Sequence, residues 1–196
     1  MTFTLERLLC DVCALLGESS QQPQSDDGTE IPAPGEILGR MVTVLLPRVG
    51  SRLIREALPE QLCGGETVEV QMHTKVARCG LYSADIPLPA GFIRLVSVRM
   101  GEWKREVCRI FGPGDQEWSR QWSEEPGIAG CPQSPHAYLS HYGEGAVLRL
   151  IGSEEAGDSP LWFRCCFVPL PDEEGVFTFP AALYGELVEA ITANIR

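Results

Sequence analysis

Residues 85–100 read DIPLPAGFIRLVSVRM, and this stretch decides how the middle of the chain is predicted to fold. Pro87 and Pro89 fix their own φ angles and hold the residue before each of them in an extended conformation. Ala90-Gly91 then predicts a turn. Across residues 96–100, valine and methionine alternate with serine and arginine, which is the period of a half-buried strand. The stretch therefore predicts an extended lead-in, a turn and a strand.

A second strand is expected to follow and to complete a hairpin. Gly101-Glu102 can reverse the chain, and residues 103–111 are the candidate partner. We expect this hairpin to be the centre of an inserted β region over residues 63–179, with a short helix near residues 115–124. Three further strands are expected to form a meander: residues 137–142, 146–151 and 161–168.

Helices are predicted at both ends of the chain. Residues 1–62 contain three segments in which apolar residues recur every three or four positions: 4–16, 35–46 and 48–58. Pro47 is the expected interruption between the last two, and the polar residues 18–34 predict a mobile loop. Residues 180–196 predict a C-terminal helix that packs on the N-terminal helices. The predicted fold class is α+β, with terminal helices in a small bundle and a mainly antiparallel β region inserted between them.

The chain carries 27 acidic and 16 basic residues, which gives a formal charge of −11. Proteins that bind nucleic acid directly use stripes of Lys and Arg, and the densest basic run here is Lys104-Arg105. We therefore expect no direct sequence-specific contact with nucleic acid. No apolar window approaches the length of a membrane span, and residues 1–7 lack the basic start of a signal peptide. We expect a cytoplasmic protein with no membrane partner.

The eight cysteines and three histidines do not follow a recognised metal or catalytic pattern. Cys10 and Cys13 have C-x-x-C spacing, yet they lie in a predicted helix and no second pair follows. His136 and His141 face opposite sides of a predicted strand. We expect reduced, buried cysteines, with a zinc or redox role as the alternative. The expectation is no catalytic residue, no cofactor, no metal ion and hence no enzyme.

Five side chains are candidates for protein contacts. Arg48, Arg52 and Arg55 recur at spacings of four and three along one side of a predicted helix, where they form either a solvated face or an oligomer contact. Trp118 and Trp122 are four residues apart on the short helix and are expected to lie one above the other. The two tryptophans are candidates for the core, for a protein contact or for an aromatic face that binds a ligand such as a sugar.

Four pieces of sequence, taken in order, carry a resemblance to a known family. They are residues 86–98 (IPLPAGFIRLVSV), Trp103, residues 167–169 (FVP) and residues 179–184 (FPAALY). Together with the terminal helices, this order resembles the structural head-to-tail connector (adaptor) proteins of tailed phages and prophages, which form rings beneath the portal. The first 60 residues share only the helix pattern.

The resemblance implies a non-enzymatic structural protein of a phage or prophage particle, with no catalytic residues to carry over. It implies a ring-forming connector subunit that assembles with itself and docks to portal or tail proteins. Such a protein is found in the cytoplasm of the producing cell and in the virion. Two alternatives stay open: a small ligand- or glycan-binding module that uses the aromatic face, and an enzyme of unrecognised type with a cysteine nucleophile.

Overall fold

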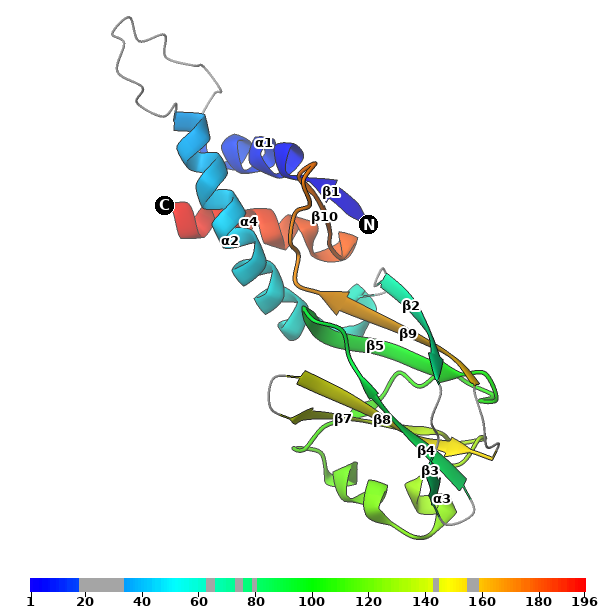
Figure 1. The fold of residues 1–196 in the computed structure, drawn as a ribbon. Helices are drawn as coiled ribbons and strands as arrows, with labels where there is room; N and C mark the ends of the chain where they lie inside the picture. Colours follow the sequence, from blue (N-terminus) through cyan, green and yellow to red (C-terminus); the bar gives the residue numbers. More distant parts are fainter. Residues whose placement is uncertain (18–33, 63–65, 73–75, 79–80, 143–144, 155–158) are drawn as a thin grey trace, which may run out of the picture. The chain divides into compact units, whose positions relative to one another are not determined.

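The structure is a computed structural model, and it describes residues 1–17, 34–62, 66–72, 76–78, 81–142, 145–154 and 159–196 (Figure 1). It has the predicted α+β fold, with helices at both ends of the chain and mainly antiparallel sheets. The chain divides into two compact units: a helical unit of residues 1–65 and 167–196, and a β unit of residues 66–166. The insertion predicted over residues 63–179 thus ends earlier, because residues 167–179 belong to the helical unit.

The described residues of the helical unit form three long helices: α1 (Leu5–Leu16), α2 (Pro34–Glu56) and α4 (Tyr184–Ile195). Each helix is in contact with the other two, and α2 runs across both α1 and α4 (Figure 1). Short 3-10 helices follow α2 and precede α4: η1 (Pro59–Leu62) and η3 (Ala181–Leu183). All three long helices contribute to the core, through Leu8, Val12, Val42, Leu46, Val49, Leu187 and Ile191.

A short antiparallel ladder joins the two ends of the chain inside the helical unit. β1 (Thr2–Thr4) pairs with β10 (Val176–Thr178). The ladder extends one step further, because the backbone N–H of Phe179 donates to the carbonyl oxygen of Met1 at 3.0 Å. The sequence does not predict this ladder, because a pairing between distant segments leaves no local pattern.

Phe3 connects this ladder to two helices. Its ring stacks on that of Tyr184 at the start of α4, with centroids 4.2 Å apart. The guanidinium of Arg7 on α1 lies over both rings, 5.7 Å from Phe3 and 5.3 Å from Tyr184. The Tyr184 hydroxyl donates to Asp11 Oδ2 at 2.8 Å. Burial, helped by this carboxylate, raises the pKa of Tyr184 above its ordinary value, so the hydroxyl stays protonated and keeps donating.

α2 continues through Pro47, where the sequence predicts an interruption. Proline in a helix interior removes one backbone hydrogen bond and typically costs about 3 kcal/mol. Burial on both sides of Pro47 offsets this cost, because Leu46 and Val49 are in the core. Gly50 lies so close to Pro169 that a Cβ built on it would be 2.5 Å from Pro169 Cγ. Packing inside the helical unit therefore sets the length of α2.

The described part of the β unit contains two sheets. The first has the strand order β2 (Glu66–Met72), β9 (Ser159–Phe167), β5 (Phe92–Met100). The second has the order β3 (Val76–Arg78), β4 (Leu81–Pro87), β8 (Gly145–Ser153), β7 (His136–Tyr142), β6 (Ile110–Phe111). β6 and β7 are parallel, and the other pairs of the second sheet are antiparallel. Between β6 and β7 lie the 3-10 helix η2 (Gln116–Trp122) and the single turn α3 (Pro126–Ala129).

The extended lead-in predicted at residues 85–89 is largely the end of a strand, β4, and Pro87 occupies its last position. Proline is tolerated there because the ladder needs no further N–H from that residue. The predicted turn is confirmed: Phe92 N donates to Pro89 O at 3.3 Å, and Gly91 has a φ of 77°. That positive φ is the reason a glycine stands at this position.

The strand after the turn is confirmed as β5, but the predicted hairpin is wrong. The strand partner of β5 is β9, and the backbone of residues 103–111 pairs with β5 at one antiparallel bridge, where Val98 and Val107 exchange hydrogen bonds of 2.9 and 2.8 Å. Trp103, directly after the turn, is 1% exposed, and its Nε1 donates to the carbonyl oxygen of Gly152 at 3.1 Å. Trp103 is buried against Gly152, and the residues after it return to β5 at Val107 without forming a strand along it.

The predicted meander is right for its first two strands and wrong for its third. β7 and β8 are antiparallel neighbours, whereas β9 joins the other sheet. β4 takes the place beside β8 that the meander gives to β9, with Asp85 directly opposite Arg149. The sequence does not show this pairing, because β4 and β8 are far apart along the chain.

Gly152 stands where two segments of the β unit approach each other closely. Its φ is 123°, and a Cβ built on it would be 2.9 Å from the carbonyl oxygen of Cys131. A side chain here would therefore meet backbone as well as a strained φ.

We expect Gly152→Ala to lower the free energy of unfolding of the β unit by about 1–3 kcal/mol, the usual range for a strained backbone conformation. Urea denaturation followed by tryptophan fluorescence measures this, because all four tryptophans lie in residues 66–166. The matched control is Gly145→Ala in the same strand, where a Cβ meets nothing within 4 Å and φ is not positive. Equal losses in both variants would contradict the close approach at Gly152.

Candidate interaction surface

The side of α2 that points away from the helical core carries a row of large apolar side chains. Ile37, Met41 and Val44 are 48%, 38% and 75% exposed. They are spaced by four and three residues, so they follow one side of a helix with about 3.6 residues per turn. The sequence pattern places Ile37, Leu38, Met41 and Val42 on one apolar side of a helix. In the structure, Leu38 and Val42 are buried, whereas Ile37 and Met41 are exposed. Single exposed apolar residues are common, but an aligned row is a candidate contact.

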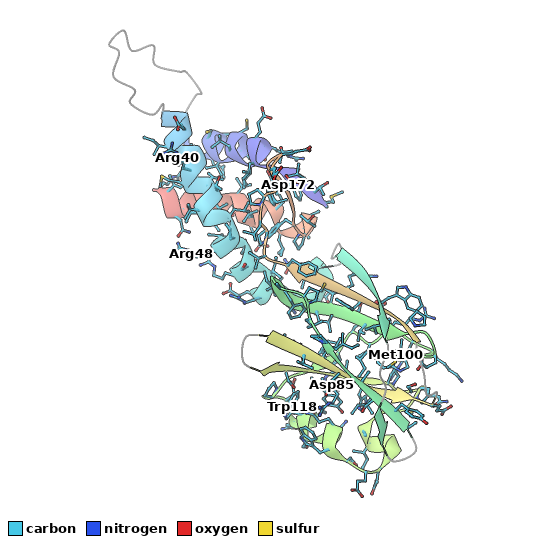
Figure 2. All side chains as sticks on the ribbon, in the orientation of Figure 1. Arg40, Arg48, Asp85, Met100, Trp118 and Asp172 are labelled. Carbon is cyan, nitrogen blue, oxygen red and sulfur yellow. The ribbon has the colours of Figure 1, made fainter. Side chains whose placement is uncertain are left out.

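The three predicted arginines continue this row toward the end of α2. Arg48, Arg52 and Arg55 are all exposed. Arg48 Nη2 donates to Asn194 Oδ1 near the end of α4 at 3.1 Å, and its side chain extends outward from α2 (Figure 2). We call the six residues Ile37, Met41, Val44, Arg48, Arg52 and Arg55 the α2 face. It is apolar in its first half and basic in its second.

The α2 face combines two kinds of side chain that proteins use at contacts. Aliphatic side chains gain about 25 cal/mol for each Å² of apolar surface removed from water. Arginine offers a planar set of donors for carboxylates and is enriched at interfaces. The α2 face includes no nucleophile or general base, so its chemistry is that of binding.

The two candidate tryptophans do not form the stacked pair that the sequence predicts. Trp118 packs on the cluster around Tyr138, with ring centroids 6.1 Å apart, whereas Trp122 is 51% exposed (Figure 2). The reason is that η2 is a 3-10 helix. With three residues per turn, side chains four positions apart point about 120° from each other. The common aromatic wall formed by Trp118 and Trp122 is therefore absent.

Trp122 instead lies beside an ion pair that the sequence analysis did not find. Arg149 Nε and Nη2 donate to the two carboxylate oxygens of Asp85, each at 2.7 Å, and Arg149 Nη1 donates to Gln121 Oε1 at 3.2 Å. The guanidinium carbon lies 5.0 Å from the centroid of the Trp122 ring. Arg149 thus ties η2 to β4 and β8. Only the strand register brings these residues together.

His136 and Tyr138 form a second contact between β7 and the segment before it. His136 Nδ1 lies 3.2 Å from the Tyr138 hydroxyl, which donates to the carbonyl oxygen of Ala129 at 3.5 Å. Burial lowers the pKa of His136 below its ordinary value of 6.5 and raises the pKa of Tyr138 to about 12. Both side chains are therefore neutral near pH 7, as suits a buried structural contact.

The expectation of buried cysteines is wrong for several of them. Cys165 and Cys166 are buried, but Cys10 and Cys108 are exposed and Cys13 is half-buried. Burial raises the pKa of the Cys166 thiol, which disfavours the reactive thiolate. Cys63, Cys79 and His73 lie outside the described residues. Within the described ranges, the acidic, cysteine and histidine side chains do not gather in a group of three or more that could hold a metal ion.

A pocket of about 300 Å³ opens beside β5 and β9. Its lining includes both charged and aromatic side chains: Arg99, Glu106, Trp162, Phe163 and Arg164. Glu106 accepts a hydrogen bond from Ser97 and lies 4.0 Å from Arg164 Nη2. No local sequence pattern marks these residues, because three separate segments supply them.

No family model matches the chain, and no curated protein matches it. None of the helices in the described part of the chain is both long enough and apolar enough to cross a membrane. The interaction surface is therefore defined by the geometry of the molecule itself.

We expect a double-mutant cycle of Asp85→Ala and Arg149→Ala to give a coupling free energy of about 1–2 kcal/mol, because the pair is bidentate and Arg149 is partly buried. Urea denaturation followed by tryptophan fluorescence supplies the four stabilities.

The control cycle uses Arg109→Ala and Glu117→Ala, a pair with a single contact of 3.1 Å in which Arg109 is 72% exposed. Glu117 is 20% exposed, so both pairs have one partly buried partner, and the control pair differs in having a single contact. A single contact of this kind contributes about 0.5 kcal/mol. A coupling no larger at Asp85 and Arg149 than at the control pair would contradict the anchoring role of Arg149.

Proposed function

We propose that this protein is a non-enzymatic structural subunit of a phage or prophage particle, which forms a ring as part of the head-to-tail connector and docks to a portal. The α2 face is the observation that carries this proposal. A monomer gains nothing from holding Ile37, Met41 and Val44 in water, whereas a subunit that assembles removes them from it.

The residues that carry the resemblance to connector proteins also have a structural role that fits. Residues 86–98 supply the end of β4, the turn and most of β5. Residues 167–169 and 179–184 lie where the chain returns to the helical unit. Pro169 and Phe179 pack against Gly50 of α2, whose Cβ, if built, would be 2.5 Å from Pro169 Cγ and 3.2 Å from Phe179 Cε2. Two of the matched segments, 167–169 and 179–184, therefore pack on the helix that carries the α2 face.

The charge of the chain fits a subunit beside which DNA passes. With a net charge of −11, the surface repels phosphates, so a duplex would slide past without binding. Identical subunits that meet through two different surfaces form a closed ring when the rotation between them closes. Self-assembly and docking are then the whole activity of the protein, which needs no cofactor.

The two other classes of function find less support. A glycan-binding module based on the aromatic face needs Trp118 and Trp122 in one wall, and they lie in different surroundings. An enzyme with a cysteine nucleophile needs a thiol of low pKa, and burial moves the pKa of Cys166 the other way.

We expect the purified full-length chain to form closed rings of a single copy number as its concentration rises, detected by native mass spectrometry and negative-stain electron microscopy. Val44→Asp should abolish assembly while the far-ultraviolet circular dichroism stays unchanged, since a charge at a 75% exposed position does not disturb the core.

Leu170→Asp is the matched control, because Leu170 is 62% exposed in the helical unit but lies outside the α2 face. This variant should assemble like the unmodified chain. A chain that stays monomeric up to its solubility limit would overturn the proposed function, and so would assembly that Val44→Asp leaves intact.

A further inference from the structure

We infer that the α2 face binds the exposed side of α4, together with the adjoining end of α1, on a second copy of this chain. The inference rests on the proposed function and names the partner of the α2 face. A second copy of this chain is the expected partner because the two surfaces are complementary in charge, in side-chain size and in the order of their residues.

The exposed side of α4 is acidic in its first half and small in its second. Glu186 and Glu189 are exposed and three residues apart, and Ala193 is exposed one turn later. At about 1.5 Å of rise per residue, Glu186 and Glu189 are about 4.5 Å apart along the axis, and Arg48 and Arg52 on α2 are about 6 Å apart. Two neighbouring carboxylates can therefore face two neighbouring guanidinium groups.

The last turn of α1 carries an exposed leucine near the end of α4. Arg196 Nη2 donates to the carbonyl oxygen of Leu15 at 2.8 Å, so the last turn of α1 adjoins the last residue of the chain. The Leu15 side chain is 46% exposed. The surface on the second copy is thus acidic at Glu186 and Glu189, small at Ala193 and apolar at Leu15. We call these four residues the α4 face.

The two faces match when the helices run antiparallel. The α2 face passes from apolar to basic along the chain, and the α4 face passes from acidic to apolar. In an antiparallel arrangement, Arg48 and Arg52 meet Glu189 and Glu186, while Val44 lies over Ala193. The small side chain of alanine lets the helices approach closely enough to exclude water from Val44.

The α4 face stays on the surface of the subunit. Glu186 Oε1 accepts one hydrogen bond from Gln61 Nε2, at 3.4 Å and on the surface. α2 and α4 contact each other through their buried sides, because Leu46 and Val49 of α2 are in the core together with Leu187 of α4. The two exposed faces are therefore different surfaces of one subunit, and they adjoin where Arg48 Nη2 donates to Asn194 Oδ1 at 3.1 Å. Contacts between different surfaces propagate from copy to copy.

Another acidic segment of the helical unit fits less well. Glu173 and Glu174 are exposed in the turn before β10, but they lie in a turn and have no helical spacing. Asp172 in the same turn is already used, because its Oδ1 accepts from the backbone N–H groups of Glu174 and Val176 at 3.0 and 2.8 Å (Figure 2). This turn serves as the control surface in the test.

The test reverses charges on each face of the full-length chain. The first variant, Arg48→Glu with Arg52→Glu, has two acidic faces, and the second, Glu186→Arg with Glu189→Arg, has two basic faces. Each variant alone should lose the oligomer in native mass spectrometry and stay folded by circular dichroism. An equimolar mixture should form contacts between the two variants, which native mass spectrometry detects as mixed species, and one chain with all four substitutions should recover the original oligomer.

The control variant, Glu173→Arg with Glu174→Arg, should assemble like the unmodified chain. If the unmodified chain assembles but the chain with all four substitutions does not recover the oligomer, the inference is wrong and the proposed function stands. Loss of assembly in the control with retention in the α4 variant would assign the contact to the turn instead. If the unmodified chain never assembles, the proposed function itself fails, and the inference fails with it.

Discussion

Backbone pairing between the first and last strands is the constraint on which the helical unit depends. It joins residues 178 positions apart, since the amino group of Met1 donates to the carbonyl oxygen of Phe179 at 3.3 Å. Phe3 then packs on Tyr184, and α1 and α4 are held in one core with α2. Because both neighbours pack on the same side of α2, its other side stays in water. The exposed face of α2 is a consequence of closing the chain in this way.

Stability and assembly place opposite demands on α2. Its inner side is tightly packed, which allows the helix to run through Pro47 despite the missing hydrogen bond. Its outer side keeps three large apolar residues and three arginines exposed. An acidic chain can hold a local basic row of this kind without general attraction to nucleic acid. In the contact that we propose, the same row meets complementary carboxylates on another copy, so that electrostatics would select the partner and apolar burial would hold it.

Only part of the α2 face could be predicted from the amino-acid sequence. The arginine spacing on α2 was predictable, because charged residues at intervals of three and four mark the outside of a helix. The exposure of Ile37 and Met41 was not predictable, since their spacing also suits the apolar stripe that packs in the core. Only the positions of α1 and α4 decide how wide the buried side of α2 is. Trp118 and Trp122 were separated by a change from an α to a 3-10 helix. The Asp85–Arg149 pair depends on a strand register that spans 64 residues.

Local order in this chain came from the sequence itself: the terminal helices, the turn at Gly91, the strand after it and the α+β class follow from periodicity, glycine and proline. These are properties of neighbouring residues, which the backbone expresses wherever the segment is placed. Strand partners were decided by tertiary structure, because β5 pairs along its length with β9 and not with residues 103–111, and β1 pairs with β10. Strand pairing depends on how much apolar surface each alternative arrangement buries, as the burial of Trp103 shows. That quantity depends on distant segments, so no short window of residues determines it.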